Sequence, residues 1–248
     1  MNVTVDVGNT FSKVGVFSGS ALVALKVIRT ETLDQELASY LGFPLVVSSV
    51  SRPVADLPLN PSAFSPFIAL TAETPLPISI NYNTPQTLGS DRIAAVCGAV
   101  TLAPGVHCLV LDAGTCLTYE WITANGLYEG GAIAPGLQMR LSAMNTFTSR
   151  LPFIKVSELP DNLNDVSLIG KDTYSCLLSG AVNGMLEEIR SIIRMYTHKF
   201  QNLQVFVCGG DARRIGKALK KPGGPGKVRI EEQLVLIGLN RILSFNVT

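Results

Sequence analysis

Two short segments of this sequence place a carboxylate, a glycine and hydroxyl side chains at the end of an alternating apolar stretch. They are DVGNTFSK, Asp6–Lys13, and DAGT, Asp112–Thr115. A glycine turn between strands can present several backbone N–H groups to one point, and such a concave group of amides binds phosphate. Lys13 adds a positive charge suited to phosphate, and a carboxylate beside phosphates can hold Mg²⁺ or another cation. The pair of turns indicates a phosphate site, although each turn alone is also ordinary hairpin chemistry.

A third glycine segment, VFVCGGDA, follows a predicted strand at 203–208. Its position at a helix start could hold the base or ribose of a nucleotide, or it could be a plain strand-to-helix connection. Neither a GxxxxGK[ST] segment nor a GxGxxG segment after a strand occurs, which argues against a P-loop or Rossmann site.

The segment PQTLGSDRIAAV places Asp91 and Arg92 at the start of a predicted helix. An acid in the first turn of a helix is stabilised by the helix dipole, and an arginine there could simply form a surface ion pair. In a phosphoryl-transfer site the Asp91 carboxylate could orient an attacking hydroxyl, and the Arg92 guanidinium could bind an anionic substrate.

The predicted elements that position these residues occur twice. Alternating apolar residues predict a meander of strands at 2–7, 12–17 and 21–27, and a second meander at 107–112, 116–122 and 127–133. We expect helices at 30–40, with Thr30 or Thr32 as N-cap, at 89–101, at 135–145 with Pro135 in its first position, at 172–199 and at 231–244. A buried strand at 45–50 precedes a poorly patterned stretch, 52–85. Two duplicated α/β halves, 1–105 and 106–248, facing each other across a cleft explain this repeat better than two independent hairpins do.

Composition narrows the class of protein. Among 248 residues, 47% are hydrophobic and 16% are charged, with a formal net charge of +1. These values predict an ordered globular protein, and they do not suggest nucleic acid or a membrane surface as a partner. We find no signal peptide and no apolar run long enough to cross a bilayer, so we expect a cytoplasmic protein. The five cysteines are predicted to be reduced, buried thiols, since they form no CxxC pair or zinc motif.

The ordered set of motifs resembles the type III pantothenate kinases, which belong to the superfamily of acetate and sugar kinases, Hsc70 and actin. The matching segments, spread over essentially the whole chain, are DVGNTFSK, LGSDR, LDAGTCLTY, GGAIAPGLQMRLSAM, DTYSCLLSG and CGGDA. The resemblance implies duplicated actin-like, or ribonuclease H-like, halves with mixed sheets flanked by helices and a nucleotide cleft between them. It also implies ATP-dependent phosphorylation of pantothenate to 4′-phosphopantothenate, the first step of coenzyme A biosynthesis.

The resemblance assigns a role to individual residues. Asp91 is implied to be the general base, and the GxDR motif to bind pantothenate. The implied ATP-binding residues are Asp6, Val7, Gly8, Asn9, Thr10, Phe11, Ser12, Lys13 and Thr115. The implied substrate-binding residues are Tyr82, Gly89, Ser90, Asp91, Arg92 and Thr173. Many relatives have Asn where this chain has Asp172, and we interpret Asp172 as the N-cap of the helix that Thr173 opens.

Ions and partners also follow from the resemblance. The family uses ATP with Mg²⁺, and its DxGT carboxylate, here Asp112, coordinates a monovalent cation, potassium or ammonium. A homodimer is implied, with pantothenate and ATP as the small-molecule partners. A non-catalytic regulatory nucleotide-binding protein of the same fold, or a kinase for another small hydroxyl acceptor, remains the alternative.

Overall fold

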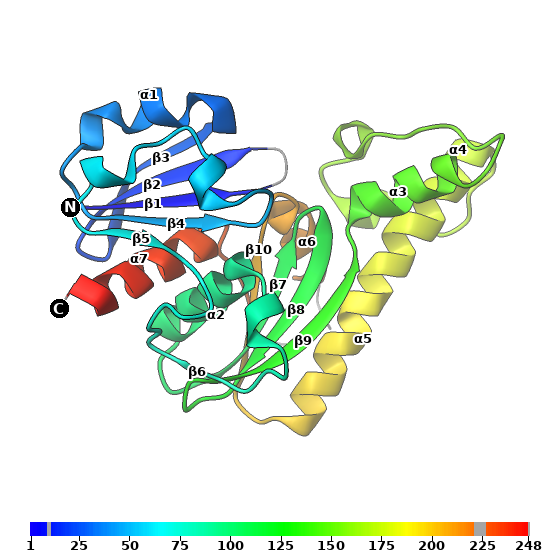
Figure 1. Ribbon diagram of the computed structural model, residues 1–248. Helices are drawn as coiled ribbons and strands as arrows, with labels where there is room; N and C mark the ends of the chain where they lie inside the picture. Colours follow the sequence, from blue (N-terminus) through cyan, green and yellow to red (C-terminus); the bar gives the residue numbers. More distant parts are fainter. Residues whose placement is uncertain (9–10, 221–226, 248) are drawn as a thin grey trace. The chain divides into compact units, whose positions relative to one another are not determined.

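The chain folds into α/β structure with two mixed sheets flanked by helices (Figure 1). The computed structural model describes residues 1–8, 11–220 and 227–247. Its contacts divide the chain into two compact units. The first unit contains Met1–Gly105, Ile122–Gly130 and Gln233–Thr248, and the second contains Val106–Trp121 and Gly131–Glu232.

The first sheet has the order β3-β2-β1-β4-β5. Its strands are β1 (Asn2–Val7), β2 (Ser12–Ser18), β3 (Ala21–Ile28), β4 (Leu45–Ser49) and β5 (Phe67–Ala69). β1 to β3 form the predicted antiparallel meander, and β4 joins β1 in parallel. The carboxyl ends of β1 and β4 therefore meet at one edge of the sheet, which is where DVGN begins its turn.

The second sheet repeats this order as β9-β8-β7-β10-β11 and adds β6 beside β9. Its strands are β6 (Ser79–Ile80), β7 (His107–Ala113), β8 (Cys116–Ile122), β9 (Leu127–Pro135), β10 (Leu203–Cys208) and β11 (Val228–Ile230). β10 runs parallel to both β7 and β11, as β4 does to β1 and β5. The shared strand order confirms the predicted duplicated α/β fold.

Seven α-helices lie within the described residues. They are α1 (Leu33–Leu37), α2 (Ser90–Leu102), α3 (Leu137–Thr146), α4 (Thr173–Leu178), α5 (Gly184–Lys199), α6 (Ala212–Leu219) and α7 (Leu234–Val247). The predicted helix 172–199 is α4 and α5 joined by a π-helical segment, Ser179–Asn183. The stretch 52–85 contains β5, β6 and short 3₁₀ turns, as its weak patterning predicted.

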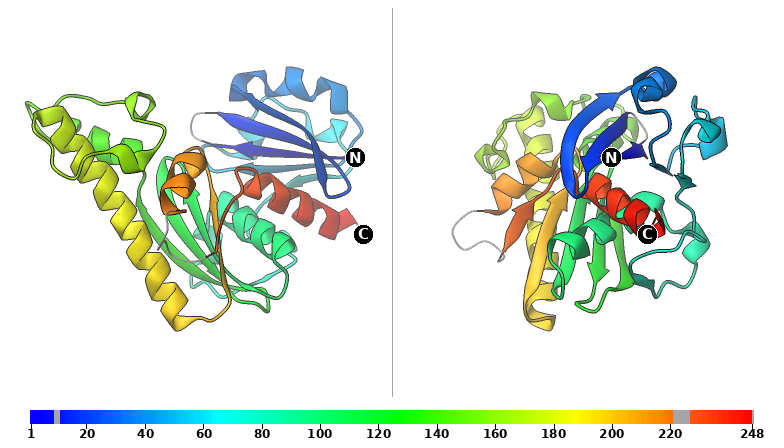
Figure 2. Two further views of the ribbon diagram at one scale, coloured as in Figure 1. Left: turned by 180° about the vertical axis from the view of Figure 1, so that it is seen from behind. Right: turned by 90° about the vertical axis from the view of Figure 1, so that its left-hand side faces the viewer.

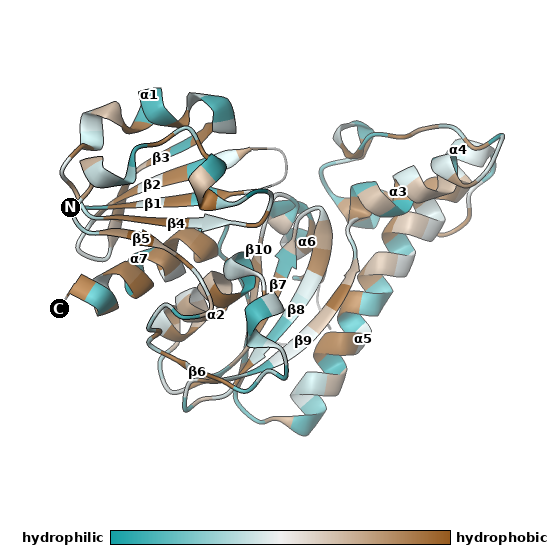
Figure 3. Ribbon diagram, in the orientation of Figure 1, coloured by the Kyte–Doolittle hydropathy of each residue, from teal (hydrophilic) through white to brown (hydrophobic). Residues whose placement is uncertain are grey.

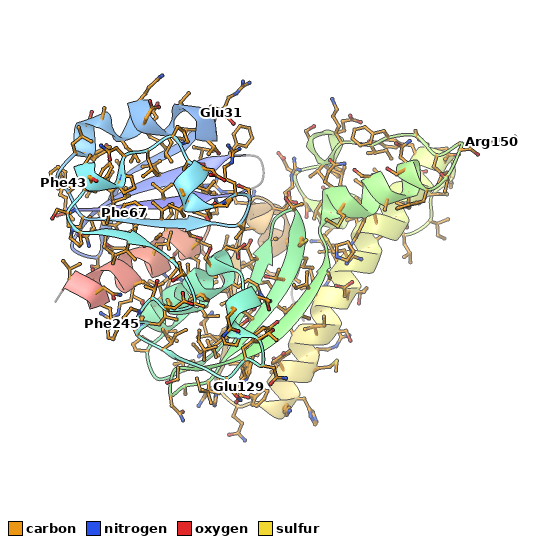
Figure 4. All side chains as sticks on the ribbon, in the orientation of Figure 1. Glu31, Phe43, Phe67, Glu129, Arg150 and Phe245 are labelled. Carbon is orange, nitrogen blue, oxygen red and sulfur yellow. The ribbon has the colours of Figure 1, made fainter. Side chains whose placement is uncertain are left out.

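Each unit has its own hydrophobic core. In the first unit, Val3, Val5 and Val7 of β1 pack with Leu33 and Leu37, and Phe43 and Phe67, labelled in Figure 4, lie against this cluster. In the second unit, α5 buries Met185, Ile189 and Ile193 against the sheet. Figure 3 shows hydrophobic and hydrophilic residues alternating along α5, which is the pattern of a helix with one buried face.

Two glycines allow α2 and α7 of the first unit to pack at very short range, and Figure 2 shows the two helices side by side. A Cβ added at Gly238 would lie 1.7 Å from the carbonyl oxygen of Ala94, and one added at Gly98 would lie 2.2 Å from that of Leu234. The obstacle is backbone in both cases, so no side-chain rotation could relieve it. The position of α2 therefore depends on α7.

Three details differ from the sequence-based expectations. Pro135 ends β9 instead of opening a helix, and α3 begins at Leu137. Neither Thr30 nor Thr32 caps α1 through its side chain, because their hydroxyls bond to Ser12 and to the Arg29 carbonyl. Cys97, Cys108 and Cys208 are buried as expected, whereas Cys116 is partly exposed and Cys176 is exposed.

Within residues 1–8, 11–220 and 227–247, none of the helices combines the length and the hydropathy that crossing a membrane requires.

The close approach of α2 and α7 predicts the effect of Gly238→Ala. The added methyl group has to push the two helices apart, so we expect the free energy of unfolding to fall by about 2–3 kcal/mol. Urea unfolding followed by circular dichroism measures the change. Gly184→Ala on α5 is the matched control, since nothing lies within 4 Å of its added Cβ, and a gain of roughly 0.5–1 kcal/mol is expected. Equal stability of the two variants would contradict the described packing.

Candidate functional site

The first glycine turn joins β1 to β2. Asp6 pairs with Lys13 across the two strands, and Val7 pairs with Ser12. The N–H of Gly8 donates to the carbonyl of Phe11 at 3.2 Å, which closes the turn. Phe11 is exposed, and Asn9 and Thr10, which the family resemblance also assigns to ATP, lie outside the described residues.

Ser12 has a different environment from its neighbours in this turn. Its side chain is fully buried, and its hydroxyl lies 2.8 Å from that of Thr30. The hydroxyl therefore already has a partner inside the first unit. Its assignment to ATP stays a prediction.

The GSDR motif lies at the same edge of the first sheet as this turn. Asp6 pairs with Ser48 in the parallel register of β1 and β4. The hydroxyl of Ser48 is 2.8 Å from that of Ser90, the first residue of α2. A continuous path, from β1 through β4 to the start of α2, thus brings Asp6 and the GSDR motif together. Sequence analysis missed Ser48, because only the register of the sheet reveals this link.

The Asp91 carboxylate folds back over the first turn of α2. Its Oδ1 accepts the backbone N–H of Arg92 at 2.8 Å, and a Cβ added at Gly89 would lie only 2.6 Å from that oxygen. Burial raises the pKa of Asp91 above 3.8, while the hydrogen bond from Arg92 and the Arg92 charge oppose this rise. A side chain at position 89 would require the Asp91 carboxylate to shift, so Gly89 leaves room for its described position.

Two tyrosines and an arginine form a wall beside Asp91. The guanidinium of Arg92, which is only 9% exposed, lies 5.9 Å from the ring centre of Tyr82, within cation–π range. The Tyr82 ring stacks on Tyr128 at 6.3 Å, and Gly130, with φ +95°, approaches it closely enough that an added Cβ would lie 3.3 Å away. Sequence analysis missed Tyr128 and Gly130, although paired glycines within a strand are a known signal of close approach.

A pocket of about 370 Å³ opens beside this motif within the first unit. Gly89 and Ser90 line it together with the polar residues Thr71, Glu73 and Thr87. A cavity of this size accepts a small organic molecule. Its lining contains Glu73 and no lysine or arginine, and Asp91, Arg92 and Tyr82 do not line it. The arginine that could bind an anionic substrate therefore lies next to the pocket in sequence and not in its lining.

The second glycine turn lies in the second unit, between β7 and β8. Asp112 pairs with Cys208 in the parallel register of β7 and β10, as Asp6 pairs with Ser48 in the first sheet. Gly209, with φ +89°, passes so close that an added Cβ would lie 2.4 Å from Asp112 Oδ1. The N–H of Asp211 donates to the carbonyl of Ala113 at 2.9 Å. The CGGDA segment is therefore part of the same turn region as DAGT.

The donor set around Asp112 suits a hard cation. The Asp112 carboxylate and the Ala113 carbonyl oxygen lie 2.4 Å and 2.5 Å from the position of a Cβ added at Gly209, and alkali and alkaline-earth cations prefer oxygen ligands. No group of three or more His, Cys, Asp and Glu side chains suited to a metal occurs in the described part of the chain. A cation here would therefore rely on Asp112, backbone oxygens and the bound ligand.

Thr173 is the first residue of α4, and it is exposed. Asp172 caps this helix, as the sequence predicted: its Oδ1 accepts the Ser175 N–H at 2.9 Å, and the Ser175 hydroxyl completes a capping box. These hydrogen bonds lower the pKa of Asp172. The predicted site residues thus fall into two groups, with Asp6–Lys13, Tyr82 and Gly89–Arg92 in the first unit and Asp112, Thr115 and Thr173 in the second.

Comparison with known proteins identifies the family. The family model described as type III pantothenate kinase matches residues 2–195. The chain is 40% identical to a type III pantothenate kinase of Cytophaga hutchinsonii, over 100% of both chains, and 38% identical to one of Bacteroides fragilis, over 99% of this chain and 98% of the relative. The chain belongs to the type III pantothenate kinase family.

Solved structures support the fold of this family. A Campylobacter jejuni protein described as a conserved putative Baf family transcriptional activator matches with a TM-score of 0.65 and 21% identity, over 99% of this chain and 98% of that one. The ROK hexokinase of Thermus thermophilus matches with a TM-score of 0.53 and 15% identity, over 100% of this chain and 99% of that one. These similarities confirm the expected actin-like α/β fold and carry no statement about activity.

The raised pKa of Asp91 predicts that this residue costs stability at neutral pH. Folding favours the protonated acid, so the stability that Asp91 contributes is present at acidic pH and is lost as the pH rises through its folded-state pKa. We expect Asp91→Asn to raise the urea midpoint at pH 7, and this gain to shrink toward pH 4.

Asp172→Asn is the matched control with the opposite sign. Its lowered pKa means that the charged form stabilises the fold above 3.8 and that this contribution is lost as the pH falls. The substitution should therefore lower the urea midpoint at pH 7. The environment described for Asp91 is wrong if both variants shift the midpoint in the same direction.

Proposed function

We propose that the chain transfers the terminal phosphoryl group of ATP to the hydroxyl of pantothenate, giving ADP and 4′-phosphopantothenate, the first step of coenzyme A biosynthesis. The observation that carries the proposal is the half-buried Asp91 carboxylate, with its raised pKa, in an intact GSDR motif next to the first glycine turn. Family membership over the whole chain supports the choice of substrate. A regulatory protein without catalysis would have no need to keep a destabilising carboxylate there.

In the proposed reaction Asp91 acts as the general base. The pantothenate hydroxyl oxygen attacks the γ-phosphorus of ATP, its proton passes to the Asp91 carboxylate, and the bond from the γ-phosphorus to the ADP oxygen breaks. A pKa raised by burial makes the carboxylate a better proton acceptor than an exposed aspartate. Asp91 must be ionised to accept the proton, so the acidic limb of the rate profile should lie above 3.8.

The remaining groups position the two substrates. Arg92, held against Tyr82, would bind the pantothenate carboxylate. Gly89 and Ser90, which line the pocket of the first unit, would contact the same substrate. Thr173 is the pantothenate contact that we propose for the second unit. The turn Asp6–Lys13 and Thr115 would bind the ATP phosphates through backbone N–H groups, hydroxyls and the Lys13 ammonium. Mg²⁺ bound to ATP would neutralise phosphate charge, and a monovalent cation, potassium or ammonium, would be held by Asp112.

We also propose a homodimer in the cytoplasm, with neither nucleic acid nor membrane as a partner. Several large apolar side chains of the second unit are exposed, which supports a protein–protein surface there. They are Ile133, Phe147, Phe153, Leu168 and Ile169. A monomeric mass by light scattering at micromolar concentration would rule out the dimer.

ADP release by the purified protein tests the reaction. With Mg-ATP we expect turnover that requires pantothenate, and Asp91→Asn should lower kcat by about 10²–10⁴-fold because the general base is lost. The dissociation constant of an ATP analogue, measured by calorimetry, should stay unchanged in this variant. Turnover that survives in Asp91→Asn would contradict the role of this residue, and a folded protein that binds ATP without turning over pantothenate would favour another acceptor or the regulatory reading.

The cation site is tested by replacing sodium with potassium in the same assay. We expect faster turnover in potassium or ammonium for the wild type, and loss of that difference in Asp112→Asn, since the amide carries no charge for the cation. Asp211→Asn is a control with a carboxylate in the same turn region. If Asp112→Asn retains the full response to potassium, Asp112 does not hold the cation.

A further inference from the structure

The turn that carries Thr115 is braced by Gly136, the residue that follows β9. The N–H of Gly136 donates to the carbonyl of Thr115 at 3.2 Å. A Cβ added at Gly136 would lie 2.3 Å from the Gly114 oxygen and 2.5 Å from the Thr115 oxygen. We call Pro135–Gly136 the strap, because it lies directly against the backbone of this turn.

Arg140 holds the strap from the first turn of α3. Its side-chain Nε donates to the carbonyl of Pro135 at 2.9 Å, and its backbone N–H donates to the carbonyl of Gly136 at 3.0 Å. Both carbonyls of the strap therefore have the same residue as a donor. The Pro135 contact requires the guanidinium to stay in one orientation.

Glu188 on α5 fixes that orientation. Its Oε2 accepts from Arg140 Nη2 at 2.7 Å, and its Oε1 accepts from the hydroxyl of Tyr119 at 3.0 Å. Tyr119 is 1% exposed, and burial, followed by the charge of Glu188, raises its pKa, so its hydroxyl remains a donor. Only a carboxylate can accept at both oxygens at once.

The ion pair between Arg140 and Glu188 is too exposed to have a mainly stabilising role. The side chains of Arg140 and Glu188 are 21% and 31% exposed, and ion pairs near the surface contribute little to the free energy of folding. The pair does, however, connect a rigid helix to the strap and so to the turn. A guanidinium that donates to both Glu188 and the Pro135 carbonyl is better suited to positioning the strap than to stabilising the fold.

We propose that Glu188 is a positioning residue for ATP: it holds Arg140, Arg140 holds the strap, and the strap holds the Thr115 turn in its phosphate-binding shape. The inference rests on the proposed function to the extent that Thr115 contacts an ATP phosphate. It adds Glu188 and Arg140 to the residues on which nucleotide binding depends, although neither touches the nucleotide.

Glu188→Gln is the test, with the dissociation constant of a non-hydrolysable Mg-ATP analogue as the first readout. The amide presents an N–H₂ group to one of its two donors, so Arg140 or Tyr119 loses its acceptor. We expect the dissociation constant to rise about 3- to 10-fold, less than the loss of a direct charge-assisted hydrogen bond to ATP would give, because the lost bond acts on ATP only through the strap. The KM for ATP should rise by a similar factor while the KM for pantothenate stays close to the wild-type value.

Glu187→Gln is the matched control. Glu187 is the preceding residue of α5 and forms its own ion pair with Arg190 at 2.6 Å, but Arg190 bonds to Asn164 and Ala218 and not to the strap. We expect wild-type ATP affinity for this variant. Arg140→Lys should raise the dissociation constant as Glu188→Gln does, because one ammonium group cannot bind the Pro135 carbonyl and Glu188 in the geometry of the guanidinium. If both residues act along one path, the double variant should bind the analogue no more weakly than the weaker-binding single variant does.

The outcomes separate this inference from the proposed function. An analogue affinity that is unchanged in Glu188→Gln, or lowered equally in Glu187→Gln, overturns the positioning role. A loss of urea stability without a change in ATP affinity also overturns it. If the wild type binds the analogue more tightly than Glu188→Gln does but never phosphorylates pantothenate, the positioning role is supported and the proposed acceptor is wrong.

Discussion

The structure depends on backbone contacts that only glycine permits. Gly98 and Gly238 let α2 and α7 meet with carbonyl groups in the contact, so the C-terminal helix sets the position of the helix that begins with the GSDR motif. The other end of α2 is fixed by the hydroxyl pair of Ser48 and Ser90. A helix held at both its body and its first residue can place a carboxylate accurately, which phosphoryl transfer needs more than it needs reactive side chains.

In the second unit, close backbone contacts at glycines fix a turn instead of a helix. Gly136 and Gly209 lie against the DAGT backbone at distances that exclude any side chain, and they approach it from different parts of the sequence. A turn braced in this way has little freedom to change its backbone conformation before a ligand arrives. Such preorganisation lowers the cost of binding an anion, because little backbone freedom remains to be lost. The duplicated strand order thus presents two comparable turns, one in each unit.

The sequence predicted the features that depend on neighbouring residues and missed those that depend on contacts between residues distant in the chain. The alternation of Val3, Val5 and Val7 and the repeated D-x-G pattern were sufficient for the meanders and the duplicated fold, since both signals are local. Pro135 was misplaced because a proline at the first position of a helix and one at the end of a strand look alike without the tertiary contacts. Ser48 carried no local signal, because it is placed by strand register. For Tyr128 the only signal was the glycine pair that follows it, and its partner Tyr82 is distant in the sequence.

Asp91 and Asp172 both lie at the start of a helix, but their pKa values are shifted in opposite directions. Asp172 is an exposed cap whose charged form is stabilised by Ser175, so it serves the helix that it precedes. Asp91 also accepts a backbone N–H in a first turn, yet burial outweighs that bond and raises its pKa. The same local chemistry therefore gives opposite contributions to stability, and the difference comes from desolvation. The raised pKa of Asp91 is consistent with the proposed role as general base, because perturbed acids are common at functional sites.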